Sequence, residues 1–323
     1  MKFKKTLISA GIAASLLFTG LASAKVMNIA FTLSPDSHYG KGAQVFAQEM
    51  DRLSDGKYEI KIKSSGVLGG ERDVIEGLQF GTIDLTISST GPVGNFVPEV
   101  YALDFPFLFT GYEHAHRILD GKIGNDLLAK FEPEGLIGLA WSENGFRHLT
   151  NSKHAVTKPA DLAGLKIRTM ENEVHMSAFK DLKAAPTPMS FTELFTALQQ
   201  GTVDGQENPI PVITTSKLYE VQDYLTLTGH VYSPAVILMS KTSWSQLNDT
   251  EKQWFKTAAA ASAKATRAAV STMEKEGIKL LKEAGVQVVE NVDKKAFADV
   301  IAPTYEMYSA KYGAELIEQI QNN

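Results

Sequence analysis

The 323-residue sequence contains no cysteine. This absence excludes disulfide bonds, thiol catalysis, cysteine-bound zinc and lipid attachment at a cysteine. A chain of this length can bury a core that is large enough to fold without disulfides, so the absence is compatible with export. The length also favours two domains rather than one.

The sequence also lacks the motifs that bind common cofactors and metals. No G-x-G-x-x-G joins a strand to a helix, and no H-E-x-x-H, calcium loop or G-x-S-x-G elbow is present. His114 and His116 are two positions apart, so they would not share one face of a helix. We therefore expect neither a cofactor nor a metal, and no motif points to catalysis.

A long apolar run is present only at the N-terminus. Three lysines precede apolar residues 7–21, and the small residues Ala22-Ser23-Ala24 follow. This order predicts a signal peptide over residues 1–24, cleaved after Ala24, and a periplasmic protein. An uncleaved membrane anchor is the alternative, which the shortness of the run disfavours.

The sequence has fewer basic residues than acidic ones, 32 against 37. Loss of the three lysines of the signal peptide changes the formal net charge from −5 to −8. No basic stripe appears, so we expect no binding to nucleic acid. An anionic ligand would have to be held by particular arginines against the overall negative charge.

Apolar periodicity predicts an α/β fold. Strands are expected over residues 27–33, 58–63 and 81–87, with helices over 42–53 and 71–80 between them. This order is typical of a parallel sheet flanked by helices. Later strand candidates, the last of which contains Pro234 and so suggests an edge or a crossing, cover residues 136–141, 165–170, 221–227 and 231–239.

A long helix is predicted near the C-terminal end. Asn248 and Glu251 have capping-box spacing, and no proline occurs between Asn248 and Ala284. At 1.5 Å per residue, one continuous helix would be about 50 Å long, which exceeds the core of a small domain. The alternative is two helices that are broken near Gly277.

Three motifs in order indicate a family. A PTPM-x-F-x-E block, a helix with ALQQG and a VDGQENP close occur between residues 165 and 209. The chain beyond the signal peptide resembles the periplasmic solute-binding proteins of TRAP transporters, the DctP-type family. The resemblance implies a two-lobed α/β periplasmic binding protein fold, with a hinge and a long helix spanning both lobes. It also implies a monomer that captures an organic acid anion and delivers it to a TRAP membrane permease.

The lobe boundaries follow from this resemblance. We expect residues 25–144 plus 234–273 to form lobe I, and residues 145–233 plus 274–323 to form lobe II. The hinge crossings are expected near residues 144–146 and 232–235.

The resemblance also assigns ligand-binding residues. Arg168 stands at the family's carboxylate-binding arginine, and Arg147, in ENGFR, at its second arginine. An arginine fork can hold a carboxylate through two parallel hydrogen bonds, although a surface ion pair is the common alternative. Asn208, in QENP, matches a ligand-contacting asparagine, and Phe191 matches an aromatic wall of the pocket or packs in the core.

Further candidates would contact the other end of the ligand. Glu71, in LGGER, is expected to accept hydroxyl hydrogen bonds or to act as a favourable acid at a helix start. Ser89 and Thr90 follow the third strand and contribute hydroxyls. His38, in the first loop, is a weaker candidate, and an exposed loop histidine is its alternative.

The ligand is predicted to be a sugar acid such as a uronate or an aldonate. Sialic-acid binders of the family carry an acid and an arginine where this chain has Ser89, Thr90 and Pro92. A C4-dicarboxylate is the alternative, but it would call for a second cation, for which Arg72 is the only obvious candidate. A periplasmic enzyme acting on acidic sugars is a remote alternative.

Overall fold

The computed structural model describes residues 24–323, so the predicted signal peptide lies outside the described residues except for Ala24. Nine strands within this part form one mixed sheet in the order β2-β1-β3-β8-β4-β7-β5-β6, and β9 pairs with β8. The strands are β1 (Lys25–Ala30), β2 (Tyr58–Lys63), β3 (Leu85–Ser89), β4 (Leu136–Asn151), β5 (Lys166–Thr169), β6 (Ala185–Pro188), β7 (Gly205–Pro209), β8 (Tyr224–Ser240) and β9 (Gln287–Val289).

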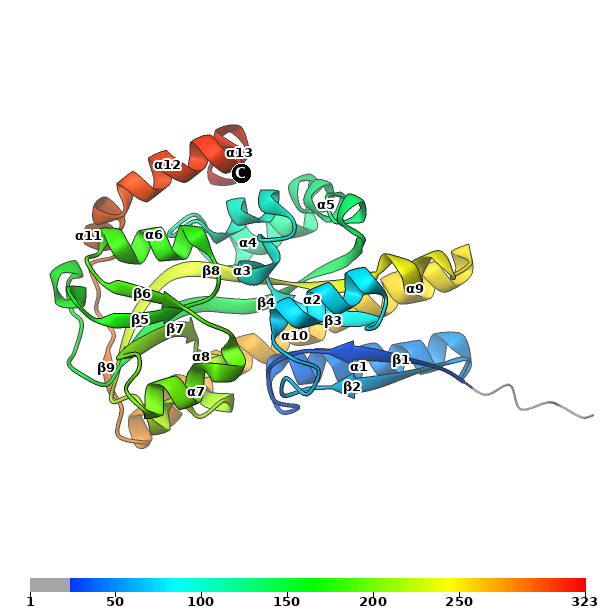
Figure 1. Cartoon of the computed structure of the whole chain (residues 1–323), viewed down its shortest axis with the longest axis horizontal. Coiled ribbons are helices and arrows are strands. Elements are labelled where there is room, and N and C mark those ends of the chain that lie inside the picture. The colour runs from blue at the N-terminus through cyan, green and yellow to red at the C-terminus, as the bar shows by residue number, and fades with distance from the viewer. Residues whose placement is uncertain (1–23) are drawn as a thin grey trace, which may run out of the picture.

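Helices cover both faces of this sheet (Figure 1). They are α1 (His38–Ser54), α2 (Glu71–Phe80), α3 (Thr90–Val93), α4 (Tyr112–Asp120), α5 (Lys122–Ala129), α6 (Glu173–Asp181), α7 (Phe191–Gln199), α8 (Ile210–Thr215), α9 (Lys241–Ser245), α10 (Asp249–Glu283), α11 (Lys294–Val300), α12 (Ala302–Tyr312) and α13 (Ala314–Asn322). No helix within residues 24–323 combines the length and the apolar character needed to cross a membrane.

The sheet is organised around two long antiparallel strands, β4 and β8. One half of β8, residues 235–239, pairs with β3, which continues into the parallel strands β1 and β2. At the other end, residues 147–151 of β4 pair with β7, which leads to β5 and β6. The two sets of short strands therefore lie at opposite ends of the long pair (Figure 1). The parallel β-α-β-α-β start predicted from the sequence is confirmed.

The two strand candidates over residues 221–227 and 231–239 are a single strand, β8. Pro234 is therefore not in an edge strand, since it lies between β3 and β4 in the middle of the sheet. It faces Glu143 where the pairing register shifts before Gly145, whose φ is +115°. This irregularity coincides with the predicted hinge crossings.

Alternate residues of β8 face two different apolar clusters. Val236 and Leu238 belong to a cluster that includes residues of α4 and α5. Ile237 and Met239 belong to a second cluster that includes residues of α1 and α10. This period of two is what a strand that is covered on both faces requires.

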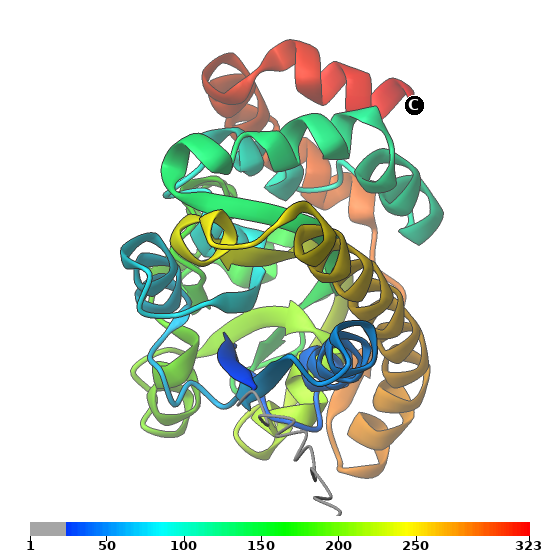
Figure 2. The same ribbon diagram turned by 90° about the vertical axis from the view of Figure 1, so that its right-hand side faces the viewer.

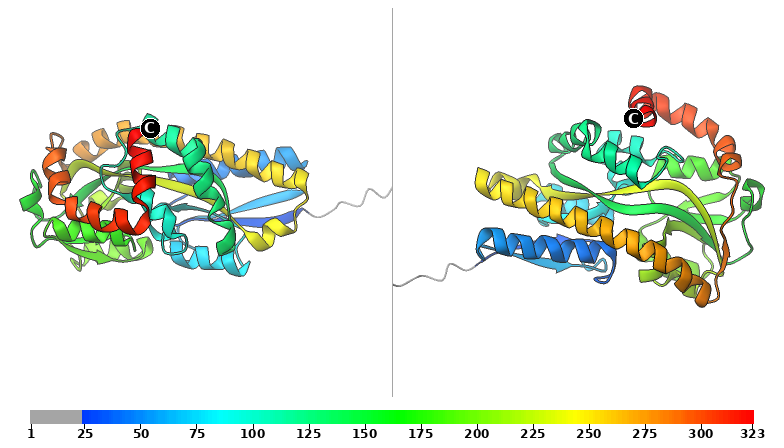
Figure 3. Two further views of the ribbon diagram at one scale, coloured as in Figure 1. Left: turned by 90° about the horizontal axis from the view of Figure 1, so that it is seen from above. Right: turned by 180° about the vertical axis from the view of Figure 1, so that it is seen from behind.

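Helix α10 is continuous over 35 residues, so the alternative of a break near Gly277 is wrong. It begins with the predicted capping box, in which Asn248 accepts from the Glu251 N–H and Glu251 accepts from the Asn248 N–H. The helix crosses the back of the whole molecule (Figure 3). A Cβ on Gly277 would come within 2.5 Å of Ile210 Cγ2, so the glycine permits close packing of α10 on α8.

The C-terminal helices, red in Figure 2, lie along one side of the molecule. Ile317 and Ile320 join the apolar cluster around α4, and His114 Nε2 lies 2.8 Å from the Ile320 carbonyl oxygen. On the other side, Thr304 Oγ1 donates to Asp181 at the end of α6 (2.6 Å). Residues 302–322 therefore bridge the two halves of the sheet.

Candidate ligand-binding site

A cavity lies beside the middle of the sheet and is lined by residues of both sets of short strands and of the segments next to them. Five of the eight predicted ligand-binding residues line it, namely Glu71, Ser89, Arg168, Phe191 and Asn208. The other lining residues are Thr32, Leu33, Tyr39, Asn144, Met170 and Val212. The wall formed by Glu71, Arg168, Met170 and Phe191 is shared with an adjoining cavity.

Arg168 lies at the carboxyl end of β5, as predicted, and is 1% exposed. Its Nε and Nη2 both donate to the Met189 carbonyl oxygen, at 3.1 and 2.7 Å. Its Nη1 is buried and has no hydrogen-bond partner in the described part of the chain. Burial lowers the pKa of Arg168 to about 10, so the guanidinium is charged at neutral pH. The site therefore holds a positive group with a free donor.

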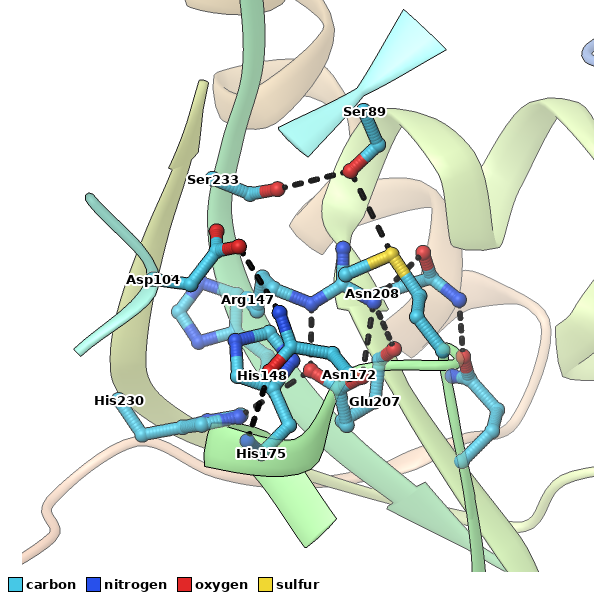
Figure 4. A network of polar contacts seen from close by, with 12 residues as sticks. Ser89, Asp104, Arg147, His148, Asn172, His175, Glu207, Asn208, His230 and Ser233 are labelled. Carbon is cyan, nitrogen blue, oxygen red and sulfur yellow. Dashed lines mark hydrogen bonds and ion pairs between the residues drawn. The ribbon is translucent and has the colours of Figure 1, made fainter. Parts of the chain in front are cut away.

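Arg147 does not line the cavity and lies behind Asn208, in a buried ion pair with Glu207 (Figure 4). Arg147 Nε donates to Glu207 Oε2 (2.5 Å), and Nη2 donates to Glu207 Oε1 (2.8 Å) and Asn208 Oδ1 (3.2 Å). Burial alone would raise the pKa of Glu207, but the charge of Arg147 and a hydrogen bond from His230 outweigh it and hold that pKa well below its usual value. The Arg147 charge is thus largely balanced within the protein, although its Nη1 is also without a partner among residues 24–323.

Glu71 is the first residue of α2 and reaches the cavity from there. Its Oε1 accepts hydrogen bonds from the Ser89 N–H (3.1 Å) and from Ser88 Oγ (3.4 Å). Burial raises the pKa of Glu71, while the Ser89 N–H and the charge of Arg168 act in the opposite direction. Glu71 therefore both occupies the first turn of α2 and lines the cavity.

Thr90 and His38 are held in the wall behind the lining residues. The Thr90 hydroxyl donates to Asp104 (2.7 Å), and Thr90 is not among the residues that line the cavity. His38 does not lie in a loop, because it is the first residue of α1, and it is fully buried rather than exposed. His38 Nε2 lies 3.1 Å from Asn144 Oδ1, and burial lowers the pKa of its imidazole to about 4. His38 therefore contacts the site through Asn144, whereas the Thr90 hydroxyl is bonded to Asp104, which does not line the cavity.

Arg72 does not line this cavity, although it lines the adjoining one together with Arg168. Its Nε donates to Glu76 (3.2 Å), and its side chain is 55% exposed. Among the described residues that line this cavity, Arg168 is therefore the only lysine or arginine. No group of three or more His, Asp or Glu residues between 24 and 323 could hold a metal ion.

Sequence reasoning missed several functional groups. Asn144 and Glu207 were within reach, because they stand in the ENGFR and QENP motifs beside residues that were chosen. Tyr39 carries no such signal, since the polar run before it looks like an exposed loop. Met170 immediately follows β5 and lies two residues after Arg168, on the same face of the predicted strand, so this signal was available.

Comparison with known proteins identifies the family of this chain. A family model described as bacterial extracellular solute-binding protein, family 7 (DctP), matches residues 29–311. A TRAP periplasmic solute-binding protein from Polaromonas sp. JS666, bound to D-erythronate, is 53% identical with a TM-score of 0.91, and the match covers 92% of this chain and 98% of that one. A second, from a Bordetella species and with density interpreted as pantoate, is 52% identical with a TM-score of 0.90 over 92% and 98% of the two chains.

A sugar acid binding protein from Advenella mimigardefordensis, in complex with galactonate, is 42% identical with a TM-score of 0.90, and the match covers 93% of this chain and 97% of that one. These likenesses confirm the predicted two-lobed α/β fold and a role in solute binding rather than in catalysis. The chain belongs to family 7 of the bacterial extracellular solute-binding proteins, the DctP family, whose members serve TRAP transporters.

Proposed function

We propose that this TRAP solute-binding protein captures a hydroxylated monocarboxylate, a sugar acid such as an aldonate or a uronate. One observation carries the proposal: the cavity is lined by Arg168, whose Nη1 has no partner among the described residues, and by the Glu71 carboxylate at the start of α2. The ligand carboxylate would bind to the guanidinium. Hydroxyl groups further along the ligand would then donate to Glu71.

The charges disfavour a C4-dicarboxylate. Arg168 is the one cation among the described residues that line this cavity. Arg72, in the adjoining cavity, is paired with Glu76, and the nearby Arg147 is balanced by Glu207. A second ligand carboxylate would have no unpaired cation and would lie close to Glu71. Like charges at such a distance in a site of low dielectric are strongly unfavourable. D-erythronate, pantoate and galactonate, found in the similar structures, each carry one carboxylate and hydroxyl groups, which supports the same class.

Binding would work through closure of two lobes. We take lobe I as residues 25–144 plus 234–273 and lobe II as residues 145–233 plus 274–323, with hinges at 144–146 and 232–235. The register shift beside Gly145 interrupts the ladder between β4 and β8 at this place, which supports a hinge there. Closure would exclude water and so strengthen the carboxylate–arginine pair. The closed monomer would deliver its ligand to the membrane permease from the periplasm, after cleavage following Ala24.

A ligand panel tests the proposal. Residues 25–323 would be mixed with D-erythronate, D-galactonate, D-glucuronate and succinate, and unfolding would be followed by thermal shift. A ligand present at one hundred times its dissociation constant should stabilise the folded state by about 2.7 kcal/mol. We expect a shift with at least one sugar acid and none with succinate. A shift with succinate alone would replace this proposal by the dicarboxylate alternative.

A further inference from the structure

Tyr39 brings an unpaired hydroxyl to the cavity wall. It is the second residue of α1, lines the cavity and is 1% exposed, and its Oη has no hydrogen-bond partner in the described part of the chain. A buried hydroxyl without a partner is costly, so such groups are rare in folded proteins. Tyr39 is not among the predicted ligand-binding residues.

Packing holds the Tyr39 ring in place. It meets Phe31 edge-on, with ring centroids 6.2 Å apart, and the His38 imidazole, with centroids 4.6 Å apart. Burial raises the pKa of Tyr39 well above its usual value, so the phenol remains neutral. A neutral phenol both donates and accepts a hydrogen bond.

Asn144 brings a second neutral group to the same cavity. Its Oδ1 accepts from Nε2 of His38 when the imidazole carries its proton there. With Oδ1 held in this way, the Asn144 amide presents Nδ2, which has no hydrogen bond to the described residues. His38 is thus a positioning residue, and its burial keeps the imidazole neutral at ordinary pH because its pKa is lowered to about 4.

We propose that Tyr39 and Asn144, together with Glu71, form a subsite that recognises a hydroxyl group of the ligand, away from its carboxylate. The inference rests on the proposed function. A hydroxyl can donate to the Glu71 carboxylate while it accepts from the Tyr39 hydroxyl or from Asn144 Nδ2. An alkyl group there would leave these buried groups unpaired, which is how a polar site rejects analogues that lack a hydroxyl.

Tyr39→Phe tests the subsite because it removes the hydroxyl and keeps the packed ring. Calorimetry would compare D-erythronate with 2-hydroxybutanoate, which has the same chain length but lacks the two hydroxyls furthest from the carboxylate. Loss of one hydrogen bond should weaken D-erythronate binding about 5- to 15-fold. Binding of 2-hydroxybutanoate should change less than about twofold, because it has no group for the subsite. Tyr219→Phe, at a tyrosine that does not line the cavity, is the matched control.

The outcomes separate the two proposals. Failure of the unaltered protein to bind any hydroxy acid would end the proposed function and this inference together. If it binds D-erythronate and Tyr39→Phe binds it equally well, only the inference is overturned. Equal weakening of D-erythronate and 2-hydroxybutanoate binding would also overturn the inference. The Tyr39 hydroxyl would then support the structure of the cavity and would not contact the distal hydroxyl groups of the ligand. Thermal melting of each ligand-free variant confirms that the proteins compared are folded.

Discussion

Arg168 keeps a charged donor in a place from which water is largely excluded. Two of its nitrogens are fixed on the Met189 carbonyl oxygen, so the guanidinium is oriented before any ligand arrives. A charged group that is oriented and desolvated in advance binds a carboxylate more strongly than one on a flexible surface chain. The affinity of the site should therefore depend on this residue more than on any other.

Arg168→Ala should weaken binding of the sugar acid by about 2–5 kcal/mol, because the ligand carboxylate would be buried without its partner. Arg168→Lys should retain part of the affinity, since an ammonium supplies charge but cannot form the two parallel bonds. Isothermal calorimetry measures both. Arg52→Ala, at an exposed arginine of α1 that lines neither cavity, serves as the control and should bind normally. Near-normal affinity of Arg168→Ala would remove Arg168 from the site.

Part of this site could be predicted from motifs in the sequence. Arg168, Asn208 and Glu71 stand in recognisable motifs, and all three line the cavity. Tyr39 was hidden because Ser37 caps α1 by accepting from the Gly40 N–H, so the helix begins inside a polar stretch that looks like a loop. Local sequence does not reveal that this turn directs the next two side chains inward.

At the scale of elements, the long strands were the hardest to predict. β8 looked like two strands because Thr228-Gly229-His230 interrupts its apolar pattern. Pro234 also argued against a central strand, because a proline cannot donate to a β ladder. The structure avoids this loss by placing Pro234 one residue beyond the pairing of Ser89 with Ala235, and at a register shift opposite β4. Short strands and helices with regular patterns, such as β2 and α2, depend on no such distant arrangement and were predicted within one or two residues.

Gly277, in α10, is another residue whose role depends on a distant part of the chain. Helix propensity alone predicts that Gly277→Ala stabilises the protein by about 1 kcal/mol. The new Cβ would meet Ile210 Cγ2 at 2.5 Å and Thr214 Cγ2 at 3.1 Å, and overpacking of this kind costs about 1–3 kcal/mol. We therefore expect a net loss of stability, up to about 2 kcal/mol, in urea unfolding.

Ser271→Ala, at an exposed position of α10, is the matched control for Gly277→Ala. It has no such contact and should be neutral or slightly stabilising. A Gly277→Ala protein that is more stable than the unaltered one would show that α10 and α8 are not packed closely at this point. The glycine would then have no packing role.

At the scale of the whole molecule, the two predicted lobes are in close contact at Gly91 and Met170. Gly91, in α3, approaches Met170 so closely that a Cβ would lie 2.5 Å from Met170 Cε and 2.8 Å from Sδ. The two residues belong to different predicted lobes, and Met170 also lines the ligand cavity. If the lobes separate when no ligand is bound, this close contact exists only in the closed form.

Gly91→Leu should therefore affect closure and not folding. We expect the ligand-free melting temperature to change by no more than about 2 °C, because the leucine would face solvent in the open form. Ligand affinity should fall at least about tenfold, and the decrease in radius of gyration on ligand addition, measured by small-angle X-ray scattering, should disappear. Gly111→Leu is the control, since a Cβ there has no atom within 4 Å. A large loss of ligand-free stability with unchanged affinity would mean that the contact is permanent and that the protein binds its ligand without lobe closure.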